Sequence, residues 1–465
     1  MNFLYILLAV FIFGVLIFIH ELGHFLVARL CGVKVLEFAI GMGPKLFGWT
    51  SKRSGTKYAI RLLPIGGFVS MLGEGGMEIV QGEQPTSNES EEKTETPIFL
   101  QSEGEDTKEP AGDTDTLYLS EEEAKHAYCN QSVWKRILIS LAGPAMNVLL
   151  GFVLMLVIIA VSGKGTLGNT TVAEFHVVYS AEESYGGLQN GDYVLMLDEN
   201  PVVSFAQMKE LVAQKNGEPF KLIVERWNED KTDTVIVELS DVVLSDTQMA
   251  SAFTSSLSEQ AGLRIGDVVL KVNRVRVHTA NELVYEISNQ GYRPVQLTVL
   301  RNGEQEVLKN VIFPSYEESG AVFGNMDFRV YPEENFHLGT ILKHTWFRSV
   351  STVKMVFDSL GGLFSGRYGM EAVSGPVGIT KTISEVAKVG WENVLYLVTV
   401  ISINLGVMNL LPFPALDGGH LLIYFIEVIR RKPMKKELEA TINFIGLIIL
   451  LALAFIILVK DIIAL

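Results

Sequence analysis

The sequence predicts a polytopic α-helical membrane protein with four transmembrane helices, a membrane-associated β-hairpin region and two extracytoplasmic α+β domains. Of its 465 residues, 48% are hydrophobic, and four apolar stretches approach the roughly 20 residues that a membrane-crossing helix needs. A repeated sequence lies between the second and third stretches. The net charge of −15 comes mainly from residues 83–125, which hold 14 Asp or Glu and three Lys, so no nucleic-acid surface is predicted.

The first apolar stretch is expected to be a retained span, because it lacks the basic start and the cleavage site of a signal peptide. Basic residues follow the first span, precede the second, and lie between the third and fourth. Because such residues favour the cytoplasmic side, both chain termini and the repeat region are expected outside the cytoplasm. The apolar stretches are residues 3–28, 137–162, 392–411 and 441–459.

Between the first two spans we expect two different regions. Residues 31–75 alternate apolar and polar side chains, with Gly and Pro at the turns, which predicts a β-hairpin region. Its apolar content just after the first span favours contact with the membrane, and an ordinary soluble hairpin is the alternative. Residues 76–130 are rich in Glu, Ser, Thr and Gly. Such a composition buries too little apolar surface to fold, so it predicts an acidic, flexible cytoplasmic loop. Cys31 and Cys129 form no motif and are assigned no role.

An internal repeat organises the region outside the membrane. Residues 186–202 and 261–277 align with an offset of 75 residues, and each shows a G-L-x-x-G-D turn followed by a strand. We expect Asp192 and Asp267 to bond to the backbone of these turns. The pattern resembles PDZ domains, modules that add an extended peptide to a sheet edge.

The helical spacing of apolar residues at 338–364 predicts an amphipathic helix, either on the outer membrane surface or packed against the repeat.

These features together divide the chain into nine predicted segments. The boundaries are 1–30 for the first span, 31–75 and 76–130 for the regions that follow, 131–163 for the second span, 164–245 and 246–318 for the PDZ-like domains, 319–390 for the amphipathic helix and linker, 391–425 for the third span, and 426–465 for the basic loop and fourth span.

The stretch HELGH in the first span carries the chemistry. His20 and His24 stand four residues apart, so on a helix both imidazoles project from one face. That spacing suits two ligands of one Zn2+ ion. Glu21 is placed to take a proton from a metal-bound water and to pass it to a leaving amine. Ionisable groups inside a span are costly and therefore indicate function.

A catalytic zinc site usually has three protein ligands and one open position. Asp417 in the third span can reach a depth similar to that of HELGH, and His420 competes for the same role. Pro412, Pro414, Gly418 and Gly419 are expected to break the helix here. Irregular backbone at membrane depth is tolerated only where protein or water covers it, so the break predicts a cavity.

HELGH in a first span, NLLPFPALDGG at 409–419 and tandem PDZ-like modules between them resemble the site-2 protease family of intramembrane zinc metalloproteases. The resemblance is greatest to its bacterial regulator-of-sigma-E protease (RseP) branch, and shorter similar stretches are GMGP, PIGGFV, AGPAMN and SGPVGI. The resemblance implies a zinc metalloendopeptidase in which His20, His24 and Asp417 bind zinc and Glu21 is the base. Asn404 and Asn409 match asparagines that hold the substrate.

The resemblance also implies partners and location. The expected substrates are single-span membrane proteins, such as anti-sigma factors and remnant signal peptides, after trimming by an upstream site-1 protease. The PDZ pair would act as a size filter, and the protein would lie in the bacterial cytoplasmic membrane with its active site toward the cytoplasm. The long acidic segment departs from the family pattern, which leaves its role unassigned.

Two other classes of protein fit some of these features. A membrane PDZ scaffold or chaperone with a structural metal site would not need Glu21 as a base. A metal transporter would show broken helices in two related halves, whereas only one span is clearly broken here and the repeat lies outside the membrane.

Overall fold

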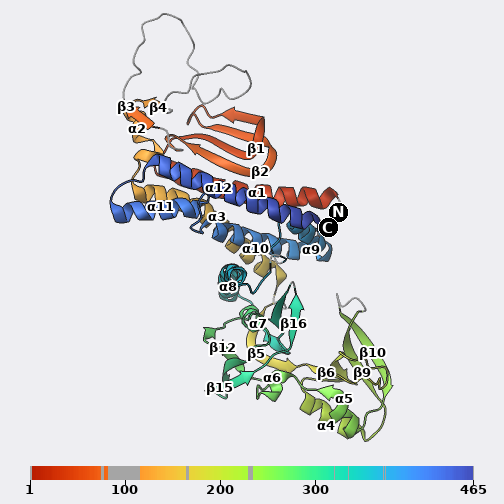
Figure 1. Cartoon of the computed structure of the whole chain (residues 1–465). Coiled ribbons are helices and arrows are strands. Elements are labelled where there is room, and N and C mark those ends of the chain that lie inside the picture. The colour runs from red at the N-terminus through yellow and green to blue at the C-terminus, as the bar shows by residue number, and fades with distance from the viewer. Residues whose placement is uncertain are drawn as a thin grey trace, which may run out of the picture. The chain divides into compact units, whose positions relative to one another are not determined.

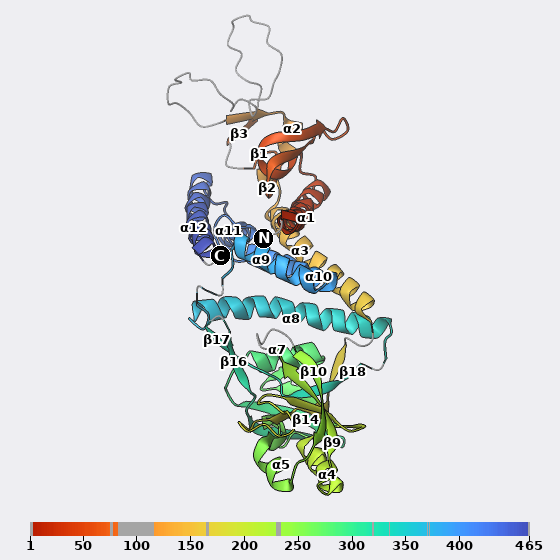
Figure 2. The same cartoon turned by 90° about the vertical axis from the view of Figure 1, so that its right-hand side faces the viewer.

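The computed structural model describes residues 3–74, 78–81, 116–163, 167–228, 234–318, 320–333, 335–369, 371 and 373–463. The chain forms two compact units. Unit 1 consists of residues 1–151 and 375–465, and unit 2 consists of residues 152–374. Figures 1 and 2 show helices and a β-sheet in the first, and strands with short helices and one long helix, Leu338–Phe364, in the second.

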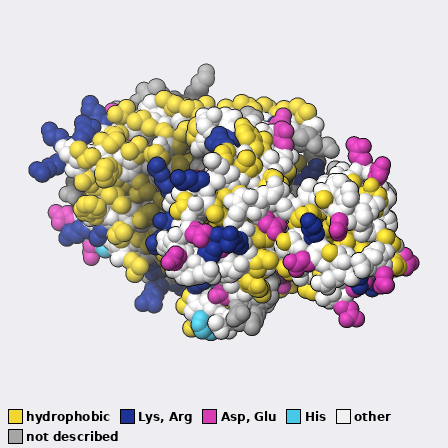
Figure 3. Space-filling view, turned by 90° about the horizontal axis from the view of Figure 1, so that it is seen from below, with side chains coloured by type: hydrophobic (Ala, Val, Ile, Leu, Met, Phe, Trp, Pro, Cys, Tyr) yellow, Lys and Arg dark blue, Asp and Glu magenta, His cyan; other side chains and the backbone are white. Residues whose placement is uncertain are grey.

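Four helices are long and apolar enough to cross a membrane, as the sequence predicted. They lie side by side in part of Figure 1 and expose many apolar side chains, and Figure 3 shows a broad area of such side chains on one face. Because apolar surface of this extent is rare on soluble monomers, it is consistent with lipid contact. The helices are α1 (Phe3–Leu30), α3 (Val133–Ser162), α10 (Trp391–Asn409) and α12 (Lys436–Ile463).

The predicted β-hairpin is confirmed as β1 (Val35–Thr50) and β2 (Lys57–Met71). Both strands are long and bent. Residues 37–40 lie against both 57–60 and 67–70, while residues 45–50 lie against 57–61. Two strands therefore build a sheet four segments wide, whose edges are 45–50 and 67–71.

The segment predicted as a flexible acidic loop, 76–130, is only partly described. Residues 82–115 lie outside the described residues. At the ends, β3 (Glu78–Gln81) pairs in parallel with β4 (Thr116–Leu119), followed by α2 (Glu121–Lys125) and a 3-10 turn at Tyr128–Asn130. The prediction was therefore wrong for 116–130. Ser120 caps α2, and Ala124 and Ala127 are buried against Leu72, which gives this short segment a core of its own.

Unit 2 contains two large sheets of corresponding strand order and a small two-stranded sheet, β16-β17. The first runs β10-β9-β7-β6-β11 and the second β15-β14-β12-β5-β18. Its elements are β5 (Gly168–Phe175), β6 (Val177–Tyr179), β7 (Tyr193–Leu197), β8 (Asn200–Pro201), α4 (Phe205–Lys215), β9 (Phe220–Trp227), β10 (Thr234–Val242), α5 (Asp246–Ala252), β11 (Phe253–Thr254), α6 (Leu257–Gln260), β12 (Val268–Val272), β13 (Val275–Arg276), α7 (Ala280–Ser288), β14 (Val295–Arg301), β15 (Glu304–Val311), β16 (Ser315–Glu318), β17 (Ala321–Gly324) and β18 (Phe328–Pro332).

Matching side-chain bonds confirm the repeat of 75 residues. Asp192 accepts a backbone hydrogen bond from its own turn and a two-pronged ion pair from Arg226, with N–O distances of 2.7 Å. Asp267 does the same with Arg301, at 2.8 and 2.7 Å. Both carboxylates are 1% exposed. The two aspartates therefore bind the turn, as expected, and also tie it to a strand.

The predicted boundary between the modules is corrected by the strand pairing. β5 was assigned to the first module, but it pairs with β12 and β18 of the second sheet. β11 was assigned to the second module, but it pairs with β6 of the first sheet. The first sheet is therefore an insertion within the second, which extends past residue 318 to β18. Local patterns predict strands but not their distant partners.

The predicted amphipathic helix is α8 (Leu338–Phe364). One face packs on α7, where the Tyr285 hydroxyl donates a 2.6 Å hydrogen bond to Asp358 and Lys354 pairs with Glu286. Packing against the repeat is therefore confirmed for this face. Another face exposes a row of apolar side chains, namely Leu338, Leu342, Trp346, Val350, Phe357 and Phe364.

The third predicted span is broken, as expected. After α9 (Pro376–Val389), helix α10 ends at Asn409 and α11 (Asp417–Arg430) follows a turn. Pro412 and Pro414 lie in the turn, but Gly418 and Gly419 lie in the first turn of α11 and do not break it. A Cβ at either glycine would collide with carbonyl groups of residues 410–413. The glycines thus allow the turn to fold closely onto α11.

Candidate metal centre

Helix α1 places His20 and His24 on one face, one turn apart. Their Nε2 atoms are 3.2 Å apart. The tight turn before α11 brings Asp417 to them from almost 400 residues away. Its Oδ2 lies 3.1 Å from Nε2 of His20, and its Oδ1 lies 3.5 Å from Nε2 of His24. The structure therefore gathers the three residues that the sequence proposed as ligands.

The geometry of these three groups fits zinc. For tetrahedral Zn2+ with bonds of about 2.0 to 2.1 Å, neighbouring ligand atoms are about 3.3 to 3.4 Å apart, and the observed separations of 3.1 to 3.5 Å bracket that value. Nδ1 of His24 lies 2.8 Å from the Ile139 carbonyl. Since a carbonyl only accepts, Nδ1 carries the proton and Nε2 is left as a lone-pair donor to a metal.

His20 is oriented by Asn147 of α3, a fully buried residue that sequence reasoning missed. The Asn147 amide nitrogen lies 3.2 Å from Nδ1 of His20, and its Oδ1 has no partner among the described residues. Amide oxygen and nitrogen are assigned from the hydrogen-bond network. Turning the amide over lets Oδ1 accept from Nδ1–H of His20. That arrangement gives Nδ1–H of His20 an acceptor and again leaves Nε2 for zinc.

Gly143 of α3 makes room for both histidines. A Cβ at this position would collide with Nε2 of His24 and lie 2.8 Å from Nε2 of His20. Gly143 and Asn147 stand four residues apart in AGPAMN, so both face α1. A glycine and a polar residue four positions apart within a span is the sequence pattern that could have identified Gly143 and Asn147.

Glu21 borders the same cavity as the three ligands. The Cβ that a side chain would add to Gly67 of β2 would lie 2.9 Å from Cγ of Glu21. Edge segment 67–71 of the sheet therefore runs beside this residue. Among the described residues, none donates a hydrogen bond to the Glu21 carboxylate, which is free to exchange a proton.

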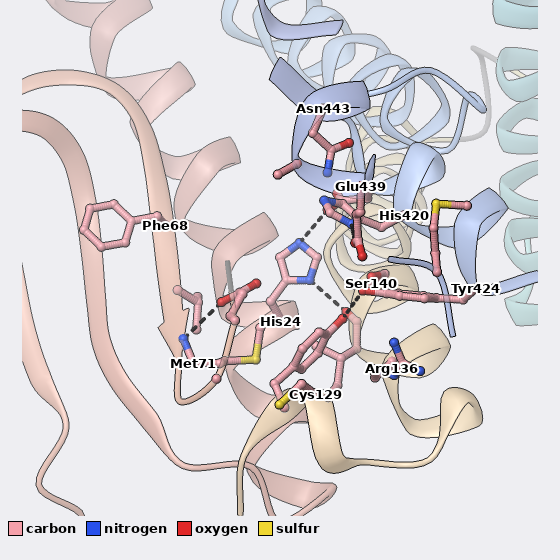
Figure 4. Close-up of a pocket in the computed structure, with 18 of the residues that line it drawn as sticks. His24, Phe68, Met71, Cys129, Arg136, Ser140, His420, Tyr424, Glu439 and Asn443 are labelled. Atoms are coloured by element: carbon pink, nitrogen blue, oxygen red, sulfur yellow. Dashed lines mark hydrogen bonds and ion pairs between the residues drawn. The ribbon is translucent and has the colours of Figure 1, made fainter. Parts of the chain in front are cut away.

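The cavity has a volume of about 590 Å³ and extends from the three candidate ligands to a second set of polar side chains, His420, Glu439 and Asn443. Figure 4 shows His24 and His420 on walls formed by different helices. Nδ1 of His420 lies 3.3 Å from Glu439, and Asn443 accepts a 3.3 Å hydrogen bond from the Ala415 amide. His420 is therefore engaged away from the three ligands, a geometry that favours Asp417 as the third ligand.

The far wall of the cavity joins α3 to α11. Arg136 donates a 2.8 Å bond to Glu427 and lies over the Tyr424 ring at 4.8 Å. The Tyr128 and Tyr424 hydroxyls are 2.9 Å apart. Burial raises the pKa of Tyr128 to about 12, so this phenol stays neutral and can donate. These bonds hold the wall opposite the ligands in place.

The two asparagines expected to hold substrate lie outside the cavity lining. Asn404 is exposed on α10, and Asn409 is half-buried at the last residue of that helix. Sequence reasoning instead missed Asn443, Glu439 and Glu74, which border the cavity. None of these three belongs to a recognisable motif, and only the fold brings them to the centre.

Two histidines one turn apart, a carboxylate within 3.5 Å of both and a glutamate bordering the same cavity fit the zinc site of a membrane protease. The chain belongs to peptidase family M50, the site-2 protease family, whose model matches residues 8–453. It is 30% identical to zinc metalloprotease RasP of Shouchella clausii, with 97% of each chain covered. It is 28% identical to the regulator of sigma-W protease RasP of Bacillus subtilis, with 97% of each covered, and 28% identical to the probable protease eep of Enterococcus faecalis, with 94% of this chain and 93% of the relative covered. The protein is therefore a multi-pass membrane zinc metalloprotease, as the sequence predicted.

Proposed function

We propose that this protease hydrolyses peptide bonds within transmembrane segments of membrane proteins that another protease has already trimmed. The observation that carries the proposal is the position of the centre. His20, Glu21 and His24 lie inside α1, a candidate span, and Asp417 follows α10, another span. A centre at that depth is suited to substrates that are themselves in the membrane.

The residues of the chain have separate tasks in the proposed hydrolysis. Zinc, when bound by His20, His24 and Asp417, polarises the scissile carbonyl and acidifies the attacking water. Glu21 takes a proton from that water and returns it to the leaving amine nitrogen. Asn147 and the Ile139 carbonyl keep the imidazoles in the tautomer that leaves Nε2 for zinc.

A transmembrane helix must become extended before its backbone can be cut. Segment 67–71 of β2 is a sheet edge that pairs only with β1 among the described residues, and it runs beside Glu21. An extended substrate added to that edge would have its backbone fixed by main-chain hydrogen bonds. Asn404 and Asn409 remain proposed substrate contacts, which requires α10 to turn or shift when substrate binds.

The arrangement across the membrane is also a proposal. Basic residues near the span ends support termini and unit 2 outside the cytoplasm, with the centre toward the cytoplasmic side. The two repeated sheets of unit 2 would be PDZ domains that exclude substrates with large outer domains. Because a relative is named a regulator of sigma-W protease, anti-sigma factors trimmed by a site-1 protease are the proposed substrates, together with remnant signal peptides.

The competing reading is an inactive membrane scaffold with a structural metal. The free Glu21 carboxylate beside the ligands supports catalysis, because a structural site needs no base.

The test compares unchanged protein with Glu21→Gln in vesicles that also hold a tagged single-span substrate. Glu122→Gln, on the exposed helix α2, is the matched control. The expected result is loss of cleavage in Glu21→Gln alone, with zinc content retained in all three proteins. Continued cleavage by Glu21→Gln would overturn the proposal. A second substrate that keeps its outer domain tests the filter separately, since it should be cut only after that domain is removed.

A further inference from the structure

A second cavity lies in unit 1, between α1 and the β1–β2 sheet. It has a volume of about 240 Å³. Its walls are apolar, with Phe18, Leu22 and Phe25 from the helix and Phe38, Trp49 and Tyr58 from the sheet. It shares no lining residue with the cavity of the metal centre. It is therefore a separate site, which the proposed hydrolysis does not use.

Aromatic rings line a continuous path from the helix to the sheet edge. The ring centroids of Phe25 and Phe38 are 5.3 Å apart, and those of Phe38 and Tyr58 are 6.1 Å apart. Trp49 stacks on Tyr58 at 5.2 Å, and Phe47 follows at 5.9 Å. The inner rings are buried or half-buried, whereas Phe47 and Trp49 are 62% and 54% exposed. The cavity thus opens toward an exposed aromatic edge.

The surface around this edge is apolar as well. Six large apolar side chains of the sheet are about half exposed, and several such side chains exposed on one element indicate an interaction surface. Since the sheet directly follows a span in the chain, a lipid surface is the environment that this composition fits. The six are Met42, Leu46, Phe47, Trp49, Ile60 and Leu62.

Four cations accompany the apolar edge. Lys45, Lys52, Arg53 and Lys57 lie on or between the strand segments that form the edge, and none pairs with a carboxylate of the described residues. Arg61 differs, because it donates to Glu37 at 2.8 Å. The Lys45 side chain folds over Gly48, where the Tyr58 backbone carbonyl also lies.

We propose that this surface binds an anionic phospholipid, with part of an acyl chain in the aromatic cavity and the headgroup beside the four cations. An apolar cavity offers no hydrogen bonds to water and accepts hydrocarbon readily. Unpaired Lys and Arg next to a membrane attract anionic lipids, which are concentrated in the cytoplasmic leaflet. The site goes beyond the proposed proteolysis and does not depend on it.

The test uses the full chain in vesicles of phosphatidylcholine and phosphatidylglycerol, in which one lipid or the other carries brominated acyl chains that quench tryptophan. The fluorescence of Trp49 is obtained by subtracting the fluorescence of Trp49→Phe from that of the unchanged protein. We expect brominated phosphatidylglycerol to quench Trp49 as if enriched about tenfold over its bulk fraction. Quenching by both lipids in proportion to their bulk fractions would overturn the headgroup preference, and absence of quenching would overturn lipid contact altogether.

Charge variants separate a specific site from general attraction. Changing all four edge cations to Gln should abolish the enrichment while leaving quenching by brominated phosphatidylcholine. The matched control removes four cations from unit 2, with Lys271, Arg274, Arg276 and Arg293 changed to Gln, and should keep the enrichment. Equal effects of the two sets would overturn the proposal. Ala59→Phe, which fills the cavity, should reduce the number of phosphatidylglycerol molecules retained on purification, as counted by native mass spectrometry.

Discussion

Replacing Asn147 by Leu tests whether this residue orients His20. Leucine has a similar size but cannot accept the Nδ1–H hydrogen bond. Asn147 is fully buried and His20 is 8% exposed, so water cannot easily replace the lost partner. An unsatisfied buried donor costs about 1 to 3 kcal/mol. Loss of an outer-shell partner lowers metal affinity by about 10- to 100-fold, which corresponds to about 1.4 to 2.7 kcal/mol. The cost of the unsatisfied donor and the expected loss of zinc-binding free energy are therefore of the same size.

Zinc affinity is measured by chelator competition on the purified full chain. Asn147→Leu should bind zinc about 10- to 100-fold more weakly, and Asn147→Asp, whose carboxylate accepts the same bond, should restore most of the affinity. Ser402→Ala is the matched control. Its hydroxyl donates a 2.7 Å bond to the Asn147 backbone carbonyl, so its loss leaves the amide side chain in place. Unchanged zinc affinity in Asn147→Leu, or an equal loss in Ser402→Ala, would refute the orienting role.

Three further changes address the ligands and the repeat. Asp417→Ala should weaken zinc binding by more than about 100-fold while His420→Ala leaves it near normal, and equal losses in metal analysis would contradict the assignment of Asp417. Gly143→Ala should prevent zinc binding because its Cβ collides with His24; a well-folded variant with full zinc content would argue against that packing. Arg301→Met leaves the Asp267 carboxylate buried without its partner, which should cost about 3 to 5 kcal/mol in the denaturant-induced unfolding of unit 2, with much of this recovered by adding Asp267→Asn, and no loss would contradict a stabilising ion pair.

Much of the fold could be predicted because its signals are local. Runs of apolar residues indicate spans whatever their partners, and the predicted ends differ from the helices by at most five residues. The G-L-x-x-G-D turns predicted the repeat, since each turn is formed by a few consecutive residues. The exchange of β5 and β11 between the sheets was not predictable in this way, because strand partners are chosen by the packing of distant segments.

The residues of the metal centre divide in the same way, into those that the local sequence predicts and those that only the fold brings together. His20 and His24 are paired by helix geometry alone. The contacts of Asn147, Glu439 and Asn443 instead arise where α3 meets α1 and where α12 meets α11 and the turn before it. A lone asparagine in a span has several explanations. Its contact with His20 becomes meaningful only when the orphaned Oδ1 and the neighbouring imidazole are seen together.

Glycines set how a substrate can approach the centre. Gly143 lets the α3 backbone pass directly beside the two histidines, Gly67 does the same for β2 beside Glu21, and Gly418 lets the turn close on α11. Close packing of this kind leaves no space for a peptide between α3 and the histidines or between the turn and α11. The approach that remains is from the cavity, between the sheet edge at 67–71 and the wall that carries His420 and Glu439. An extended substrate entering there would meet Glu21 and the three candidate ligands together, which is the arrangement that the proposed hydrolysis requires.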